Sequence, residues 1–246
     1  MSNIPHIIHY CWFGGSPKPE LVTNCIETWR KYFPNWEIKE WNEDNYDINK
    51  VAYTKEAYEA KKWAFVADYA RFDVLYQYGG IYLDTDVEFL KPLPDQYLEL
   101  DGFTGFECTG IVAPGLIFAV KKGFPIVEDI LNQYRKEHFE IRKDGIYKTV
   151  NLHVTEVLEN NGLRRDNTLQ TIENLTVFPA EYFCGYDTDI HEPDITDNTI
   201  CWHHYFASWS DETVKEKIQR IIKRIIGGKL YKKLIILKRQ LVKEFL

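Results

Sequence analysis

Hydrophobic positions along the first hundred residues change repeatedly between the spacing of a strand and that of a helix. Apolar residues alternate or run unbroken where we predict strands, and they recur every three or four residues where we predict helices. Expected strands cover 5–13, 36–41, 81–83, 87–90, 102–106, 115–120, 171–178 and 199–202, and expected helices cover 20–33, 62–78, 125–137 and 148–160. This alternation predicts an α/β sandwich with a mostly parallel central sheet.

Residues 211–246 have a different pattern from the rest of the chain. Apolar residues there recur at helical spacing among eleven lysines and arginines, with only four acidic residues. We therefore divide the chain into a main domain, 1–210, and a basic amphipathic helical tail, 211–246. The tail pattern is typical of a helix that lies on anionic lipid. A helix packed on the body, or a dimer contact, is the alternative.

Composition excludes several classes of protein. The chain carries a net charge of −7 although its tail is basic, and so acidic a body argues against nucleic-acid binding. No run approaches the ~20 apolar residues of a membrane-spanning helix, and the first residues lack the order of a secretory signal. The five scattered cysteines do not have zinc-site spacing. We expect a cytoplasmic protein with reduced thiols.

The stretch YGGIYLDTD at 78–86 contains the strongest candidate for chemistry. Asp84 and Asp86 directly follow a short apolar run, and residues two apart on a strand point to one side. Solvated Asp-x-Asp turns are common. These two carboxylates, however, lie between apolar β-type segments and would repel each other without a positive charge. We therefore predict a divalent cation there, completed by waters and a substrate diphosphate.

The helix before this stretch is apolar on almost all sides, yet it carries two charged residues. Asp68 and Arg71 are three positions apart and share one helix face. Such a helix should be buried, where unpaired charges are costly. Either the two residues form a private ion pair, or their face opens on a ligand. In the second case Asp68 accepts sugar hydroxyls and Arg71 donates to sugar or phosphate.

Two further segments place aromatic and imidazole groups at strand ends. Trp12 follows the first strand, where an indole is either a core residue or a flat surface for a nucleobase. The segment CWHHYFASW at 201–209 contains two adjacent histidines, which point to opposite faces if the chain is extended. One of them can face the aspartate pair and add a third ligand. Ser208 and Trp209 follow, where they can touch phosphate and cover the site.

Three segments together resemble glycosyltransferase family 32, which has a sugar-binding Asp-x-Asp region. They are IPHIIHYCWFGG at 4–15, WAFVADYARFDVLYQYGGIYLDTD at 63–86 and HHYFASW at 203–209. The family includes capsular-polysaccharide transferases and yeast mannosyltransferases, and the catalytic domains of clostridial glucosylating toxins are distant relatives. The resemblance implies a GT-A fold over 1–210, a nucleotide-sugar donor, Mn²⁺ or Mg²⁺, and retention of the anomeric configuration.

The resemblance also implies roles for residues that bind the donor. Trp12 matches the position that stacks on the nucleobase, and Tyr82 lies beside the donor. Asp68 and Arg71 match the pair that holds the donor sugar and the diphosphate. Together these positions predict a site for a complete nucleotide sugar.

The same resemblance implies a metal site and a closing loop. Asp86 would ligate the metal directly, and Asp84 would touch ribose and sugar or reach the metal through water. His204, in preference to the histidine before it, matches the third ligand. Ser208 and Trp209 match the loop that closes on the β-phosphate.

From these residues we expect a metal-dependent retaining hexosyltransferase of surface or capsular polysaccharide synthesis. The expected donor is UDP-galactose or UDP-glucose, with GDP-mannose as an alternative. The expected acceptor is a saccharide or a lipid-linked saccharide, because the chain has no room for the insertions with which the toxins bind proteins. We see no acid or base for the opposite sugar face, so the leaving phosphate oxygen is expected to take the acceptor's proton. The tail would place the enzyme on the inner face of the plasma membrane.

Two other functions compete with this interpretation. A metal-dependent nucleotidyltransferase or sugar-nucleotide hydrolase can also use paired aspartates. It would need an early glycine-rich basic loop or a water-activating base, and we find neither. A non-enzymatic carbohydrate-binding protein would explain the aromatic residues, but not the four charged residues at 68, 71, 84 and 86.

Overall fold

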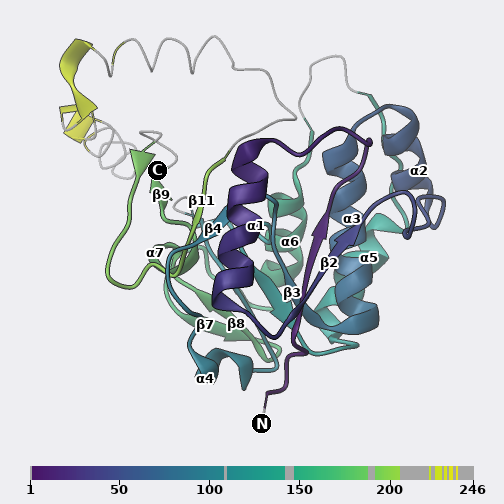
Figure 1. Ribbon diagram of the computed structural model, residues 1–246, viewed down its shortest axis with the longest axis horizontal. Coiled ribbons are helices and arrows are strands. Elements are labelled where there is room, and N and C mark those ends of the chain that lie inside the picture. The colour runs from purple at the N-terminus through teal and green to yellow at the C-terminus, as the bar shows by residue number, and fades with distance from the viewer. Residues whose placement is uncertain are drawn as a thin grey trace.

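The computed structural model describes most of the chain up to residue 205 and part of the tail (Figure 1). The described residues are 2–107, 110–141, 147–187, 192–205, 222, 225–228, 230–231, 233–234 and 237. Ser208, Trp209 and most of the basic tail lie outside them. No helix in the described segments is long and apolar enough to cross a bilayer.

A seven-stranded sheet forms the centre of the fold, in the order β2-β1-β3-β6-β5-β8-β7. Its strands are β1 (Ile7–Cys11), β2 (Glu37–Trp41), β3 (Gly80–Tyr82), β5 (Gly102–Gly105), β6 (Phe118–Val120), β7 (Gln170–Ile172) and β8 (Leu175–Phe178). Strands β1, β2, β3, β5 and β8 point in one direction, and β6 and β7 oppose them. The expected α/β fold with a mostly parallel central sheet is confirmed.

The single strand expected at 171–178 is wrong. The chain reverses there, and β7 and β8 pair as an antiparallel hairpin. The two residues between them, Glu173 and Asn174, have φ angles of +47° and +67°. Two positive φ values give the turn a twist that suits a two-residue hairpin. The sequence does carry a signal for this turn, because two consecutive polar residues, Glu173 and Asn174, interrupt the apolar alternation.

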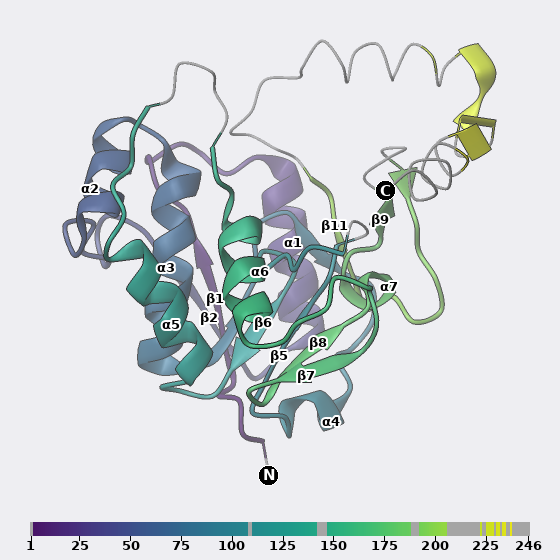
Figure 2. The ribbon, with the colours of Figure 1, turned by 180° about the vertical axis from the view of Figure 1, so that it is seen from behind.

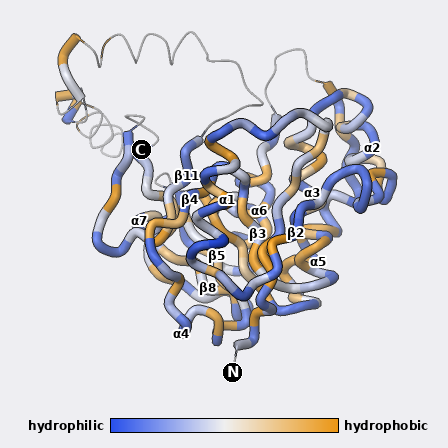
Figure 3. The backbone as a smooth tube through the Cα atoms, in the orientation of Figure 1, coloured by the Kyte–Doolittle hydropathy of each residue, from blue (hydrophilic) through white to orange (hydrophobic). Residues whose placement is uncertain are grey.

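Helices cover both faces of the sheet (Figures 1 and 2). The helix α1 (Glu20–Tyr32) lies on one face, whereas α3 (Trp63–Tyr78), α5 (Pro125–Tyr134) and α6 (Val150–Asn160) lie on the other. The short helices are α2 (Ala52–Glu59), α4 (Asp95–Leu98) and α7 (Ala180–Phe183). Hydrophobic residues concentrate along the central strands, and the connections are largely hydrophilic (Figure 3).

Two small strand pairs lie outside the central sheet. One pairs β9 (Tyr186–Asp187) with β10 (Glu192–Pro193). The other pairs β4 (Val87–Phe89), which directly follows the aspartate pair, with β11 (Cys201–His203) from the end of the main domain. This second pair brings the late histidines back to the Asp-x-Asp segment.

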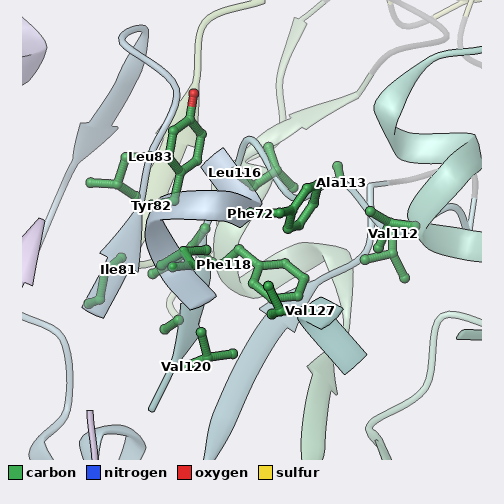
Figure 4. Close-up of a cluster of buried hydrophobic side chains, with 14 of the residues drawn as sticks. Phe72, Ile81, Tyr82, Leu83, Val112, Ala113, Leu116, Phe118, Val120 and Val127 are labelled. Atoms are coloured by element: carbon green, nitrogen blue, oxygen red, sulfur yellow. The ribbon is translucent and has the colours of Figure 1, made fainter. Parts of the chain in front are cut away.

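Aromatic packing fixes α3 against the sheet. Phe72 of α3 meets Phe118 of β6 edge to face, with ring centroids 5.4 Å apart, and Val127 of α5 lies beside them (Figure 4). All three side chains are buried. An edge-to-face pair adds about 0.5–1.5 kcal/mol to the stabilisation from burial. The N-terminal half of α3 is thereby held at the carboxyl ends of the parallel strands.

Gly79 controls how α3 passes into β3. Its φ is +67°, and a Cβ at this position would lie 2.6 Å from the backbone nitrogen of Lys122. Only glycine has neither problem, because it has no side chain and adopts positive φ without penalty. The helix therefore ends abruptly, and β3 starts at the next residue.

His9 is a fully buried structural residue of β1. Its Nδ1 accepts a hydrogen bond from the Trp41 indole at 3.1 Å, and its Nε2 lies 2.8 Å from the carbonyl oxygen of Gly79. This arrangement needs a neutral ring with its proton on Nε2. Burial lowers the pKa of His9 from its ordinary value of 6.5 to about 4.

The stabilisation that His9 provides should depend on pH. Above pH 6.5 the ring is neutral in both the folded and the unfolded chain, so the contribution is constant. Between pH 6.5 and 4 the unfolded chain binds a proton that the folded chain does not, which removes about 3 kcal/mol from the free energy of unfolding. Urea unfolding of wild type and His9→Gln at pH 7, 6, 5 and 4 measures this term. The difference between the two proteins should shrink as pH falls, and a constant difference would contradict the assignment.

Candidate active site

The carboxyl ends of β1 and β3 place the predicted site residues at one edge of the sheet. The two strands are neighbours and run parallel. Trp12 directly follows β1, and Asp84 stands two positions after β3. Ligands of open α/β sheets bind outside this edge.

Arg71 links Asp68 to Asp84. Its Nη2 donates a hydrogen bond to Asp68 Oδ1 at 2.9 Å, and its Nη1 forms an ion pair with Asp84 Oδ1 at 3.3 Å. The guanidinium is 4% exposed, and Nη1 has no hydrogen-bond partner among the described residues. The pair predicted on α3 therefore exists, but it is not private, because it extends to the Asp-x-Asp segment.

One guanidinium serves the buried carboxylate of Asp68 and the half-buried carboxylate of Asp84, and the two respond differently. Burial raises the pKa of Asp68 to about 7, although Arg71 opposes the rise. At Asp84 burial also acts upward, but Arg71, His203 and Tyr82 outweigh it and lower the pKa to about 2. Asp84 is thus ionised at every physiological pH, while Asp68 can carry a proton near neutrality.

Tyr82 contacts both Asp84 and Arg71. Its hydroxyl donates to Asp84 Oδ1 at 3.1 Å, and the guanidinium carbon of Arg71 lies 4.7 Å from its ring centroid. The ring is buried, while its oxygen points away from the surrounding apolar cluster (Figure 4). Tyr82 therefore orients Asp84 and stacks on Arg71. Whether it also touches a donor stays a prediction.

Gly115 is a part of the site that the sequence did not reveal. Its carbonyl oxygen accepts a hydrogen bond from the Asp84 backbone N–H at 2.9 Å. A Cβ at this position would lie 1.9 Å from Asp84 Oδ2, so any other residue would displace that carboxylate. The sequence gives one weak signal, a glycine at the start of an expected strand.

The pairing of β11 with β4 decides which histidine faces the aspartates. His203 lies opposite Val87 in the antiparallel register. Its Nε2 is 3.3 Å from Asp86 Oδ1 and 3.9 Å from Asp84 Oδ2. The aspartate pair and His203 therefore converge at one place.

His204, which we expected at the aspartate pair, points the other way. Its Nε2 lies 2.9 Å from Glu88 Oε2, and its ring packs on Trp202 with centroids 4.0 Å apart. His203, and not His204 as we expected, therefore lies beside the aspartate pair. The physical reason is the register with β4, because successive residues of a strand face opposite sides.

The converging groups suit a hard divalent cation. Carboxylate oxygens and an imidazole nitrogen are ligands that Mn²⁺ accepts, and two carboxylates alone suit Mg²⁺. In the described part of the chain, no three His, Cys, Asp or Glu side chains already stand at the spacing of a formed metal centre. The side chains that would hold the cation are Asp84, Asp86 and His203. Waters and a ligand diphosphate would complete the coordination.

Trp12 lies half-buried at the same edge. Its indole N–H donates to the carbonyl oxygen of Ser16 at 2.7 Å, and Lys18 Nζ is 5.8 Å from its ring. The hydrogen bond fixes the plane of the ring without burying it. A fixed, partly exposed indole can stack on a flat ligand group.

Comparison with known proteins identifies the region that carries these charged residues. Residues 19–103 match the family model described as "Glycosyltransferase sugar-binding region containing DXD motif". The chain carries the DXD sugar-binding region of the glycosyltransferases. The resemblance found in the sequence is confirmed. The matched region contains Asp68, Arg71, Asp84 and Asp86, whereas Trp12 and His203 lie outside it.

Curated proteins similar to this chain differ in how much they share with it. Inositol phosphoceramide mannosyltransferase 1 of Schizosaccharomyces pombe is 29% identical over 104 residues, which cover 38% of the chain and 31% of the relative. The chain thus spans about a third of that relative's length. The uncharacterized glycosyltransferase L373 of Acanthamoeba polyphaga mimivirus is 24% identical over 223 residues, which cover 84% of each protein.

Solved structures similar to this chain include two glycosyltransferases. The PaToxG glycosyltransferase is 19% identical with a TM-score of 0.45, and the match covers 64% of this chain and 68% of that one. A glycosyltransferase involved in the glycosylation of the major capsid of PBCV-1 is 10% identical with a TM-score of 0.47. That match covers 88% of this chain and all of the other.

Proposed function

We propose that the protein is a retaining, metal-dependent hexosyltransferase that uses a nucleotide diphosphate sugar as donor. The observation that carries the proposal is the connection of Asp68 through Arg71 to Asp84, next to Asp86 and His203. Asp68 can accept hydrogen bonds from sugar hydroxyls, Arg71 can bind phosphate oxygens, and the remaining three side chains can hold a metal ion. A sugar diphosphate presents hydroxyls, phosphate oxygens and a metal-binding diphosphate in the same order.

Each residue of the site has its own role in the proposed reaction. A bound Mn²⁺ or Mg²⁺ would neutralise charge on the leaving diphosphate. Arg71 would donate to a diphosphate oxygen through Nη1, which has no hydrogen-bond partner among the described residues. Asp68 would accept a hydrogen bond from a sugar hydroxyl, and Trp12 would stack on the nucleobase. The leaving phosphate oxygen would take the acceptor's proton, and the product would retain its anomeric configuration.

The donor and acceptor form the finer part of the proposal. UDP-galactose or UDP-glucose remains the proposed donor, and the name of the S. pombe mannosyltransferase supports GDP-mannose as the alternative. The proposed acceptor is a saccharide or a lipid-linked saccharide, and the same name supports an acceptor that carries a lipid, because inositol phosphoceramide is a lipid. The proposed role is surface or capsular polysaccharide synthesis on the inner face of the plasma membrane. Co-sedimentation of full-length protein and a 1–210 truncation with anionic vesicles tests the membrane part, and equal binding would remove it.

Calorimetric titration tests the core of the proposal. UDP and GDP are titrated into the protein with Mn²⁺ and again with EDTA. We expect one nucleotide to bind, and only with the metal present. A panel of nucleotide sugars is then screened for slow metal-dependent hydrolysis, which identifies the donor. Equal affinity with Mn²⁺ and with EDTA, or no binding of either nucleotide, would reject the proposed function.

The two adjacent histidines provide a matched test of the metal site. His203→Gln should weaken Mn²⁺-dependent nucleotide binding by about ten- to hundredfold, the range found when groups around a metal are removed. His204→Gln should leave it almost unchanged, because that ring pairs with Glu88. Calorimetric titration of Mn²⁺ with saturating nucleotide measures both variants. The reverse order of effects would show that the β4–β11 register does not place the ligand.

A further inference from the structure

A third strand end reaches the edge of the sheet that carries the aspartate pair. Strand β5 runs in the same direction as β3, because both pair antiparallel with β6. Asp84 stands two positions beyond β3 and Glu107 two positions beyond β5. Because Tyr82 and Thr104 both lie opposite Phe118, Glu107 is one residue further along its strand than Asp84. Since β6 separates the two strands, their ends lie about 10 Å apart at ~4.8 Å per strand. This spacing leaves room for one sugar ring.

The Glu107 carboxylate is held in place. The side-chain amide of Asn151, in the first turn of α6, donates to Glu107 Oε2 at 3.4 Å. The Glu107 backbone N–H donates to the carbonyl oxygen of Ile111 at 2.8 Å, which closes a tight turn. Next to this turn, the Val112 N–H donates to Thr155 Oγ1 at 2.9 Å and ties the segment to α6. Glu107 and Asn151 are both only half-buried, so a ligand can reach them.

The segment that begins with Glu107 ends on the aspartate pair. Gly115 closes it against Asp84, with a backbone hydrogen bond of 2.9 Å. The connection from Glu107 to Gly115 therefore links this carboxylate to the segment that would hold the metal.

We propose that Glu107 accepts a hydrogen bond from a hydroxyl of the donor hexose, and that Asn151 positions its carboxylate. This inference rests on the proposed function. A hexose whose diphosphate is bound at Asp84 would lie close to that carboxylate, because one sugar ring fits the estimated gap of about 10 Å between the two strand ends. Asp68 on α3 would then bind the sugar from one side and Glu107 from the other, over Gly115. Carboxylates with fixed orientation suit this task, because they only accept hydrogen bonds and hydroxyls donate them.

A comparison of bare nucleotides with nucleotide sugars isolates this role. Calorimetric titrations in MnCl2 use UDP and GDP, then UDP-glucose, UDP-galactose and GDP-mannose. Glu107→Gln should weaken binding of the preferred nucleotide sugar by about tenfold or more, as expected for the loss of a hydrogen bond to a charged group. Its affinity for the bare nucleotide should stay within about threefold of wild type, because the hydrogen bond is to the hexose. Asn151→Ala should show the same selective loss at smaller size.

Controls separate this role from a structural one. Glu156→Gln changes a carboxylate on α6 that pairs with Lys148 at the surface, and it should alter neither affinity. Thermal unfolding of Glu107→Gln should match that of wild type. Equal loss for bare nucleotide and nucleotide sugar, or no loss for either, would overturn the assignment to the hexose. Failure of the wild type to bind any nucleotide with Mn²⁺ would instead reject the proposed function and this inference with it.

Discussion

Asp86→Asn is expected to reduce metal-dependent turnover of the nucleotide sugar by about 10³-fold or more, since the cation loses an anionic ligand and the leaving diphosphate its neutralising charge. The folded protein should survive the change. Asparagine keeps an oxygen that can accept a hydrogen bond from His203 Nε2, which lies 3.3 Å from Asp86 Oδ1, so thermal stability without metal should stay close to that of wild type. Hydrolysis of the donor found in the nucleotide-sugar screen measures the first effect, and thermal unfolding in EDTA measures the second.

Glu88→Gln is the matched control for this change. Glu88 lies two positions beyond Asp86, but its carboxylate pairs with His204 instead of facing the metal site. We expect turnover close to that of wild type. If both variants lost activity equally, the effect would come from the β4 strand as a whole, and the cation would not need Asp86.

Arg71→Met should lower the free energy of unfolding by about 3–5 kcal/mol, because it leaves the buried carboxylate of Asp68, and the half-buried one of Asp84, without their shared cation. Turnover should also fall by about 10²–10³-fold, the usual loss when a donor to developing charge is removed. Both effects have the same cause, since one guanidinium balances the fold and the proposed leaving group. Urea unfolding and donor hydrolysis measure them.

The chain contains a control for the stability of this pair. Arg30 and Glu27 are also three apart on a helix, with nitrogen and oxygen 2.6 Å apart, but the Arg30 side chain is 58% exposed. Arg30→Met should cost no more than about 0.5 kcal/mol, because water screens a surface pair. If the two arginine variants were equally stable, the carboxylates around Arg71 would be solvated or protonated in the folded protein.

Local spacing predicted the charged part of the site. Asp68 and Arg71 belong to one helix and Asp84 and Asp86 to one segment, so the distances within each pair follow from the geometry of that element. The Gly-Gly break that joins the two elements is also visible in the sequence. The contact between Arg71 and Asp84 follows once this helix and the strand after it are predicted correctly, because the two elements are consecutive in the chain.

The rest of the site depends on contacts between distant segments. His203 faces the aspartates because β11 pairs with β4 in one register, and a shift of one residue would present His204 instead. Gly115 and Glu107 belong to the β5–β6 connection. Their positions depend on β6 running against its neighbours, and apolar periodicity carries no information about strand direction. Such pairings could not be read from the spacing of residues along the chain.

The β4–β11 pair also has a consequence for biosynthesis. A ribosome completes the Asp-x-Asp segment long before it adds His203. The central strands β1, β3, β5 and β6 can assemble on the nascent chain, while β4 still lacks its partner. A nascent chain or a protein truncated before β11 would therefore hold an incomplete metal site beside an unpaired strand edge, which is prone to aggregation. The ability to turn over a nucleotide sugar would arrive only with the last strand of the main domain.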